Sequence, residues 1–199
     1  MTGQPSYRDL PLSRFIELLS GPDPAPSGGG AAALAVSMGA GLCAMAARLS
    51  ARELTAGETA DLTAHAERIA TTAASLIQAD ADSYRGVIAA RRQPAGAHGE
   101  SRRRQIAAAL SDAAAVPMEI VELAVPAARI AARLAAAGNP SLRGDAITGA
   151  LLAEAGGRAA AVLVGINLAS APNDGRPARA ARLVAELASL ADAAQRSGR

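Results

Sequence analysis

The sequence contains no lysine and no tryptophan, and its 199 residues include one phenylalanine, two tyrosines and one cysteine. All basic side chains except two histidines are therefore arginines, which together with the abundant Ala and Gly is typical of a bacterial genome of high GC content. The single cysteine, Cys43, excludes an internal disulfide, and we expect it to be a small buried apolar residue. With few aromatic residues, a core must be built from Ala, Leu, Ile and Val, which favours closely packed helices.

The sequence also lacks a strong net charge and an apolar leader. A formal charge of +2 argues against nucleic acid as the main partner, and the polar first nine residues do not predict a signal peptide. Residues 24–47 are uncharged and long enough for a membrane span. They are rich in Ala and Gly, which gain little from lipid, so a buried core helix is the preferred interpretation. We therefore expect a cytoplasmic protein that binds no membrane.

No stretch alternates long enough to predict a strand, whereas apolar spacings of three and four predict helices. We expect helices over residues 11–20, 29–52, 58–92, from about 101 to 134, over 141–169 and around 183–190. Pro117 should kink the fourth of these or divide it in two. The prediction is a single all-α domain, residues 1–199, built as a bundle of about five to six long helices.

Apolar stripes assign faces to these helices. The first should bury one stripe, Leu12, Phe15, Ile16 and Leu19. The second is apolar all round and should be central, with Met as core filler rather than part of a cofactor site. One of its faces is small (Ala33, Ser37, Gly41 and Ala44), and the other is a bulky seam (Leu34, Met38, Leu42, Met45 and Leu49).

The entry into the second helix combines two prolines with three glycines, Gly28, Gly29 and Gly30. The chain should arrive extended, because proline disfavours a helix just before it. Glycine permits backbone conformations that other residues avoid and allows another group to approach closely. A helix N-terminus offers unpaired N–H groups and a positive dipole end. This segment therefore predicts a binding site for an anion or a carbonyl oxygen.

Asp80 stands on the apolar stripe of the third helix, four residues before Tyr84. A carboxylate there must be paired or hydrogen-bonded, or its pKa must rise. Two interpretations stay open: a structural Asp bonded to a helix N-terminus or an Arg, and a general acid/base in a cleft. Asp82 lies off the stripe and is expected to be solvated.

Three later polar residues are further candidates. Asn139 lies in a Gly-Asn-Pro sequence that predicts a helix end followed by a new helix start. Asp145 falls in the first turns of that new helix, where an acid suits the dipole or serves a site. Asn167 interrupts an apolar run and needs partners, either structural or from a ligand.

Other features give weaker signals. Arg102–Arg104 form a basic cluster at a helix start, against the dipole preference, and predict either a solvated face or a binding site for a polyanionic tail such as polyglutamate. His65 and His98 are too isolated to predict a metal site. Ser27 has no nearby His or Asp signature of a catalytic nucleophile.

Together these motifs resemble the cyclodeaminase/cyclohydrolase family of folate enzymes, which includes formiminotetrahydrofolate cyclodeaminase and methenyltetrahydrofolate cyclohydrolase. The resemblance runs from Phe15 to Asp174, in the order Pro26-Ser27-Gly28-Gly29-Gly30, Asp80 to Tyr84, Ala115-Val116-Pro117, Gly138-Asn139 with Asp145, and Ile166-Asn167-Leu168. It implies an all-helical homodimer with a reduced folate, with or without a polyglutamate tail, in a cleft at or near the subunit interface. It implies no metal or organic cofactor.

The resemblance also implies residue roles. The reaction is either hydrolysis of 5,10-methenyltetrahydrofolate or cyclodeamination of 5-formiminotetrahydrofolate. Asp80 would be the proton shuttle, with Asp145 as a second or orienting acid. Gly28–Gly30, Tyr84, Asn139 and Asn167 would bind the substrate.

The sequence departs from the family pattern at several positions. The family usually reads Pro-Gly-Gly-Gly-Ser, but here Ser27 precedes the glycines and Ala31 follows them. Ala95, Gly144 and Leu163 stand where the family usually has Lys, Ser and Asn. Losing the Lys and the Asn removes two polar groups that could hold folate. Two alternatives therefore stay open: a non-catalytic dimer that binds folate or a partner protein, and a diverged enzyme with another substrate.

Overall fold

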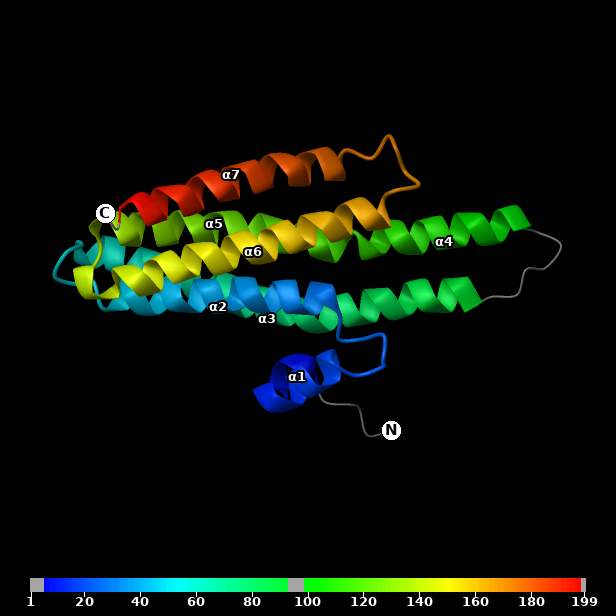
Figure 1. Cartoon of the computed structure of the whole chain (residues 1–199), viewed down its shortest axis with the longest axis horizontal. Helices are drawn as coiled ribbons and strands as arrows, with labels where there is room; N and C mark the ends of the chain where they lie inside the picture. Colours follow the sequence, from blue (N-terminus) through cyan, green and yellow to red (C-terminus); the bar gives the residue numbers. More distant parts are fainter. Residues whose placement is uncertain (1–5, 93–98, 198–199) are drawn as a thin grey trace.

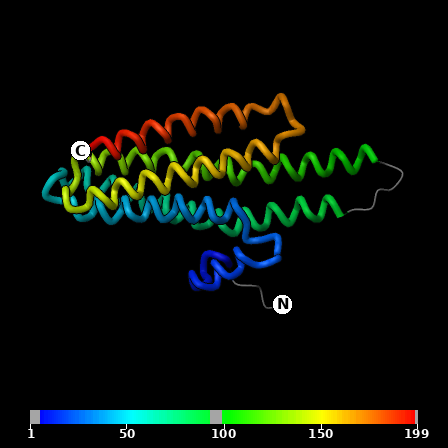
Figure 2. The backbone as a smooth tube through the Cα atoms, in the orientation of Figure 1, coloured from blue at the N-terminus to red at the C-terminus, as the bar shows by residue number. Residues whose placement is uncertain are grey.

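The computed structural model describes residues 6–92 and 99–197. These residues form seven α-helices and two 3₁₀ turns, and no strand is found among them, which confirms the all-α prediction. The elements are η1 (Tyr7–Asp9), α1 (Leu12–Leu19), α2 (Gly28–Arg48), α3 (Ala56–Arg92), α4 (Gly99–Ala113), α5 (Ala115–Ala137), η2 (Pro140–Leu142), α6 (Arg143–Asn167) and α7 (Arg176–Arg196). Helices α2 to α7 run lengthwise along the bundle, and α4 continues the line of α5 (Figure 1). Along the bundle axis, α3 and α4 extend beyond the ends of α2 and α6 (Figure 2).

Helices α2 and α6 pack antiparallel at very short distance through glycines. A Cβ atom added to Gly39 would lie 2.7 Å from the carbonyl oxygen of Gly149, and one added to Gly156 would lie 2.7 Å from that of Ala32. Neither position tolerates a side chain without a shift of backbone. Most small residues of α2, Ala33 and Ala44 among them, therefore face its neighbours α3, α5 and α6, whereas Gly41 is exposed.

The bulky seam expected in the core lies instead on the outside of α2, so that prediction was wrong. Met38 and Leu49 are 46% and 54% exposed, and Leu34, Leu42 and Met45 are only half-buried. The close approach of α6 explains this, because only small side chains fit between the two helices. Helix α6 also turns apolar side chains outward. We call Met38, Leu49, Leu151, Val162 and Ile166, all exposed, the α2–α6 outer face.

The stripe predicted for α1 is also only partly buried. Phe15 is 5% exposed and joins the core, whereas Leu12, Ile16 and Leu19 are exposed. The eight-residue helix lies beside the bundle (Figure 1). It is anchored there by one aromatic ring rather than by its whole apolar face.

Pro117 divides the fourth predicted helix in two: α4 ends at Ala113 and α5 begins at Ala115. Proline has no N–H, so the carbonyl of Ala113, four residues earlier, loses its helical partner. The side-chain amide of Asn167 donates to that carbonyl oxygen at 3.2 Å. Asn167 thus compensates for the break. The Ala113 carbonyl is in turn the structural partner that a half-buried Asn requires.

Two helical stretches, Gly28–Arg48 and Pro140–Asn167, have the length and composition of membrane spans. Both are integral to the bundle, and more than half of the first is buried inside it. Core helices of soluble proteins pass the same test, so the finding is weak evidence for a membrane.

Candidate active site

Asp80 of α3 lies against the first turn of α2. Its carboxyl oxygen Oδ2 accepts hydrogen bonds from the Ser27 hydroxyl at 3.0 Å and from the Gly30 amide at 3.1 Å. The side chain is buried, with 8% of the residue exposed. The two segments are about 50 residues apart in the chain, and the packing of α2 on α3 brings them together.

The two hydrogen bonds show how the start of α2 is capped. Ser27 is the N-cap residue, but its hydroxyl makes no capping bond to its own helix. Asp80 accepts the Gly30 amide hydrogen instead, so the acceptor that this helix end requires comes from a neighbouring helix. The positive end of the α2 dipole also favours a carboxylate at this position. This matches the structural interpretation of Asp80 as an Asp bonded to a helix N-terminus.

Gly29 leaves the space that the carboxyl group occupies. A Cβ atom at this position would lie 1.9 Å from Asp80 Oδ1, whereas a Cβ at Gly28 would meet no atom within 4 Å. No described glycine has a positive φ. The expectation that the glycines serve unusual backbone conformations was therefore wrong. The other expectation, close approach of another group, is met at Gly29, where the Asp80 carboxyl group lies.

The environment of Asp80 raises its pKa. Burial is the largest cause, and the hydrogen bonds from Ser27 and Gly30 oppose it without cancelling it. All hydrogen bonds to the carboxyl group from the described residues fall on Oδ2. Oδ1 accepts no hydrogen bond from them, yet it is not a fully buried atom, so solvent can reach it. The site therefore holds a carboxyl group that is fixed on one oxygen and open on the other.

The raised pKa predicts the pH dependence of an Asp80→Asn variant. The folded protein binds this proton more tightly than the unfolded chain, so Asp80 costs stability as pH rises through its folded-state pKa. The Asn side chain carries no such cost. The free energy of unfolding of the variant minus that of wild type should therefore increase between about pH 3 and pH 7. Urea unfolding at several pH values measures this difference, and a difference that stays constant or decreases contradicts the predicted direction.

Two other predicted residues lie toward the Asp80 end of the bundle. Tyr84 follows Asp80 by about one turn of α3 and is 38% exposed, so it is not buried with the apolar stripe of that helix. Asn167 ends α6, which runs antiparallel to α2 and so ends near the start of α2. Its side-chain nitrogen Nδ2 donates to the carbonyl oxygen of Ala113. Asp82 is exposed, as expected.

Asn139 and Asp145 lie at the opposite end of the bundle. The Asn139 side chain donates to the carbonyl of Leu49, just past the end of α2, and accepts the Ser141 amide hydrogen, which caps η2. Gly30 and Leu49 are nineteen residues apart, or about 28 Å along a helix. One chain therefore does not bring Asn139 or the half-buried Asp145 together with Asp80, contrary to the single cleft that the sequence suggested.

Ser27 is the site residue that sequence reasoning missed. Its neighbours in the sequence carry no signature of a catalytic nucleophile, and its partner is 53 positions away in the sequence. The one local signal was a Ser at the boundary between an extended segment and a helix, which predicts an N-cap rather than a contact with another helix. Ala95 and His98 lie outside the described residues.

The basic cluster lies at the projecting end of α4. Arg103 and Arg104 are exposed, and Arg102 donates to the carbonyl of Arg91 at the end of α3. The cluster is thus remote from Asp80, by about 16 Å along α3. Within residues 6–92 and 99–197, no three His, Cys, Asp or Glu side chains are arranged to hold a metal ion.

The fold and the site define a class: an all-helical bundle in which one helix presents a buried carboxyl group to the N-terminus of another. The chain belongs to the formiminotransferase-cyclodeaminase family, in its cyclodeaminase part, because that family model matches residues 11–196. This confirms the resemblance noted in the sequence. The family is one of folate cyclodeaminases and cyclohydrolases.

A solved structure shares the fold. The crystal structure of formiminotetrahydrofolate cyclodeaminase from Thermotoga maritima superposes with a TM-score of 0.79 over 95% of this chain and 94% of that one. The two sequences are 22% identical, so the likeness shows the fold alone. Among the curated proteins, none matches the chain.

Proposed function

We propose that this protein is a one-carbon enzyme of folate metabolism that hydrolyses 5,10-methenyltetrahydrofolate or cyclodeaminates 5-formiminotetrahydrofolate. The observation that carries the proposal is the Asp80 carboxyl group, buried, raised in pKa and open on Oδ1. A general acid/base works best when its pKa lies near the working pH. Burial shifts Asp80 in that direction.

In hydrolysis, water adds to the carbon between the two folate nitrogens and loses a proton. The resulting tetrahedral carbon then releases one nitrogen, which gains a proton, and a formyl group remains on the other. Asp80 Oδ1 accepts the first proton and donates it to the leaving nitrogen. In cyclodeamination a folate nitrogen attacks the formimino carbon and loses its proton to the same carboxyl group, which then donates that proton to the amino group that leaves as ammonia.

The start of α2 supports the same chemistry. The amides of Gly28 and Gly29 make no hydrogen bond to described residues and lie in the first turn of the helix. Such N–H groups, with the helix dipole, stabilise an oxygen that carries negative charge. We propose that they bind a ligand oxygen, with Tyr84 beside the ring system. The Ser27 hydroxyl holds Oδ2 and so keeps Oδ1 directed at the substrate.

We further propose that the working unit is a homodimer formed through the α2–α6 outer face. Exposed apolar side chains on two adjacent helices indicate a surface that another molecule covers. Two helices of about 35 Å length offer about 700 Å² per copy, or about 1,400 Å² in total, within the ~1,200–2,000 Å² of stable interfaces. A two-fold axis across the middle of this face would place Asn139 and Asp145 of one copy near Asp80 of the other. The dimer would then complete a site that one chain leaves divided.

The dimer predicts the behaviour of charged variants. A Met38→Glu/Val162→Glu protein should be monomeric, because four carboxylates would be buried in each dimer without partners. An Ala108→Glu protein, altered on the exposed surface of α4, serves as the matched control and should remain dimeric. Gel filtration with light scattering gives the masses. A monomeric wild type, or an unchanged double variant, would exclude this interface.

The absorbance of methenyltetrahydrofolate, with and without protein, tests the function. Loss of the chromophore faster than the uncatalysed rate supports the hydrolase, and ammonia release from formiminotetrahydrofolate supports the cyclodeaminase. Thermal stabilisation by folate without turnover of either substrate would favour a non-catalytic binding protein. Leu163, half-buried one turn before Asn167 where the family usually has Asn, is the observation that favours this second candidate.

A further inference from the structure

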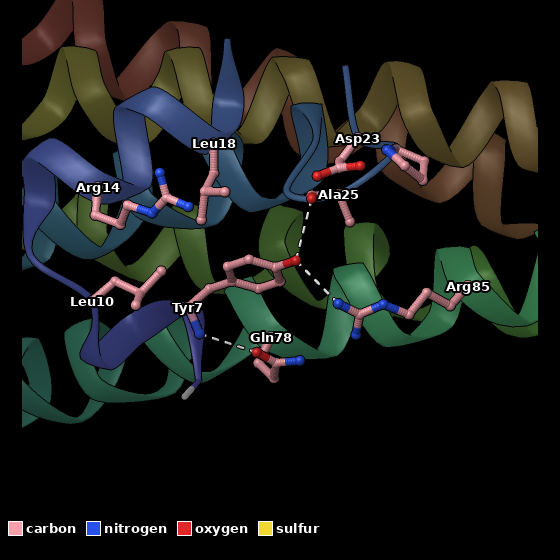
Figure 3. A pocket seen from close by; sticks show the side chains of 9 residues that line it. Tyr7, Leu10, Arg14, Leu18, Asp23, Ala25, Gln78 and Arg85 are labelled. Carbon is pink, nitrogen blue, oxygen red and sulfur yellow. Dashed lines mark hydrogen bonds between the residues drawn. The ribbon is translucent and has the colours of Figure 1, made fainter. Parts of the chain in front are cut away.

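A separate hollow lies on the outer side of α3, between η1, α1 and the segment that leads into α2. Its volume is about 560 Å³, within the ~300–1,000 Å³ of small-molecule sites. Figure 3 shows the Tyr7 ring across its middle, with Arg14 on one side and Arg85 on the other. Gln78 and Arg85 border it from α3, while Asp80 faces the opposite side of that helix. An occupant of the hollow therefore does not touch Asp80.

The wall of the hollow suits an anion with an apolar body. Leu10, Leu18 and Pro24 provide apolar surface, and the polar lining includes two guanidinium groups against one carboxylate, Asp23. A guanidinium binds a carboxylate through two parallel N–H donors, which a single ligand group can occupy. The chemistry therefore favours a monocarboxylate carried on an aromatic or aliphatic frame.

Both guanidinium groups retain donors for such a ligand. Arg14 donates to Glu17 and Arg85 to Asp82, each a carboxylate on its own helix. All four side chains are about half exposed, and exposed pairs of this kind contribute only about 0–1 kcal/mol. Each guanidinium has five N–H donors, so neither pair exhausts them.

The hollow is connected to Asp80 by a short chain of hydrogen bonds. Arg85 donates to the Tyr7 hydroxyl at 3.0 Å, and that hydroxyl donates to the carbonyl of Ala25 at 3.2 Å. Two residues further along, Ser27 donates to Asp80. Tyr7 is itself fixed, because its amide donates to the Gln78 side chain at 3.1 Å. The segment that holds Asp80 from one side is thus held by Tyr7 from the other.

We propose that this hollow binds a small organic monocarboxylate, and that its occupant acts on the Asp80 site through the Tyr7–Ala25 hydrogen bond. The bound carboxylate competes with the Tyr7 hydroxyl for the Arg85 guanidinium, which turns toward the ligand and away from Tyr7. The Tyr7 hydroxyl then loses its donor partner, and the segment from Ala25 to Gly30 becomes less tightly held. An effect on turnover rests on the proposed function, whereas binding and its effect on this segment do not.

Titration with 2-naphthoate tests the binding, and no tryptophan emission interferes because the sequence contains none. We expect saturable binding that weakens about tenfold or more in Arg14→Gln and in Arg85→Gln, since each loses a charge-assisted bond. Arg104→Gln, which also removes an exposed arginine paired on its own helix, is the matched control and should bind as wild type does. Equal binding of the neutral 2-naphthamide, or equal binding by both hollow variants, overturns the site.

Hydrogen–deuterium exchange tests the connection without any assay of turnover. Naphthoate should speed exchange of the Gly30 amide, which donates to Asp80, in the wild-type protein. A Tyr7→Phe protein keeps the ring but lacks the hydroxyl, so naphthoate should still bind and leave the exchange rate unchanged. Unaltered exchange in saturated wild type, or the same acceleration in Tyr7→Phe, overturns the connection. Failure of the folate assay alone would count against the proposed function and not against this site.

Discussion

An Asp80→Asn protein is expected to turn over its folate substrate about 10²–10⁴-fold more slowly than wild type, the range for loss of a positioned acid/base. The amide oxygen of Asn can still accept the hydrogen bonds from Ser27 and Gly30. The fold should therefore survive, and the loss should fall on kcat rather than KM. The rate of chromophore loss from methenyltetrahydrofolate, at saturating substrate, measures it.

The matched control is Asp61→Asn. Asp61 lies on the same helix but is exposed, so the change removes one carboxylate from α3 without touching the site. It should turn over substrate as wild type does. Wild-type turnover by Asp80→Asn would remove Asp80 from the mechanism, and the carboxyl group would then have only its structural role.

A Gly29→Ala protein should lose both stability and activity. The added Cβ would lie 1.9 Å from Asp80 Oδ1, far inside any real contact, so the carboxyl group or the first turn of α2 must move. Overpacking of this kind typically costs about 1–3 kcal/mol. Displacing Asp80 also separates it from Ser27 and Gly30, which leaves a buried carboxyl group without partners. Urea unfolding measures the change in free energy.

The neighbouring Gly28→Ala protein isolates this effect. Its Cβ meets no atom within 4 Å, and Ala is favoured over Gly in a helix by about 1 kcal/mol. Gly28→Ala should therefore be as stable as wild type or more so. Equal stabilities for the two alanine variants would show that α2 and α3 separate more easily than the packing implies.

Local signals in the sequence predicted the elements well. The range of α3, the division at Pro117 and the N-cap at Asn139 all depend on residues within a few positions of each other, where proline geometry and capping act. Asp80 stood out because a single carboxylate interrupts an otherwise apolar stripe. Each of these predictions needed no knowledge of which helices are neighbours.

Predictions that required long-range packing were less successful. Helix α2 is apolar on every side, so composition could not decide which face turns inward. Gly39 and Gly149, 110 positions apart, decide it, because their contact admits only small side chains. The bond between Ser27 and Asp80, and the separation of Asp80 from Asn139, likewise depend on how helices are placed in space. No local pattern contains that information.

The hydrogen bond from the Gly30 amide to Asp80 has a consequence for how related sequences are interpreted. Because the carboxyl group completes the start of a core helix, a descendant that had abandoned catalysis would still need an acceptor at this position. An acidic residue here is consequently a marker of the architecture, and its presence alone does not certify an active enzyme. Polar groups that the helix itself does not require are the better indicators of retained chemistry.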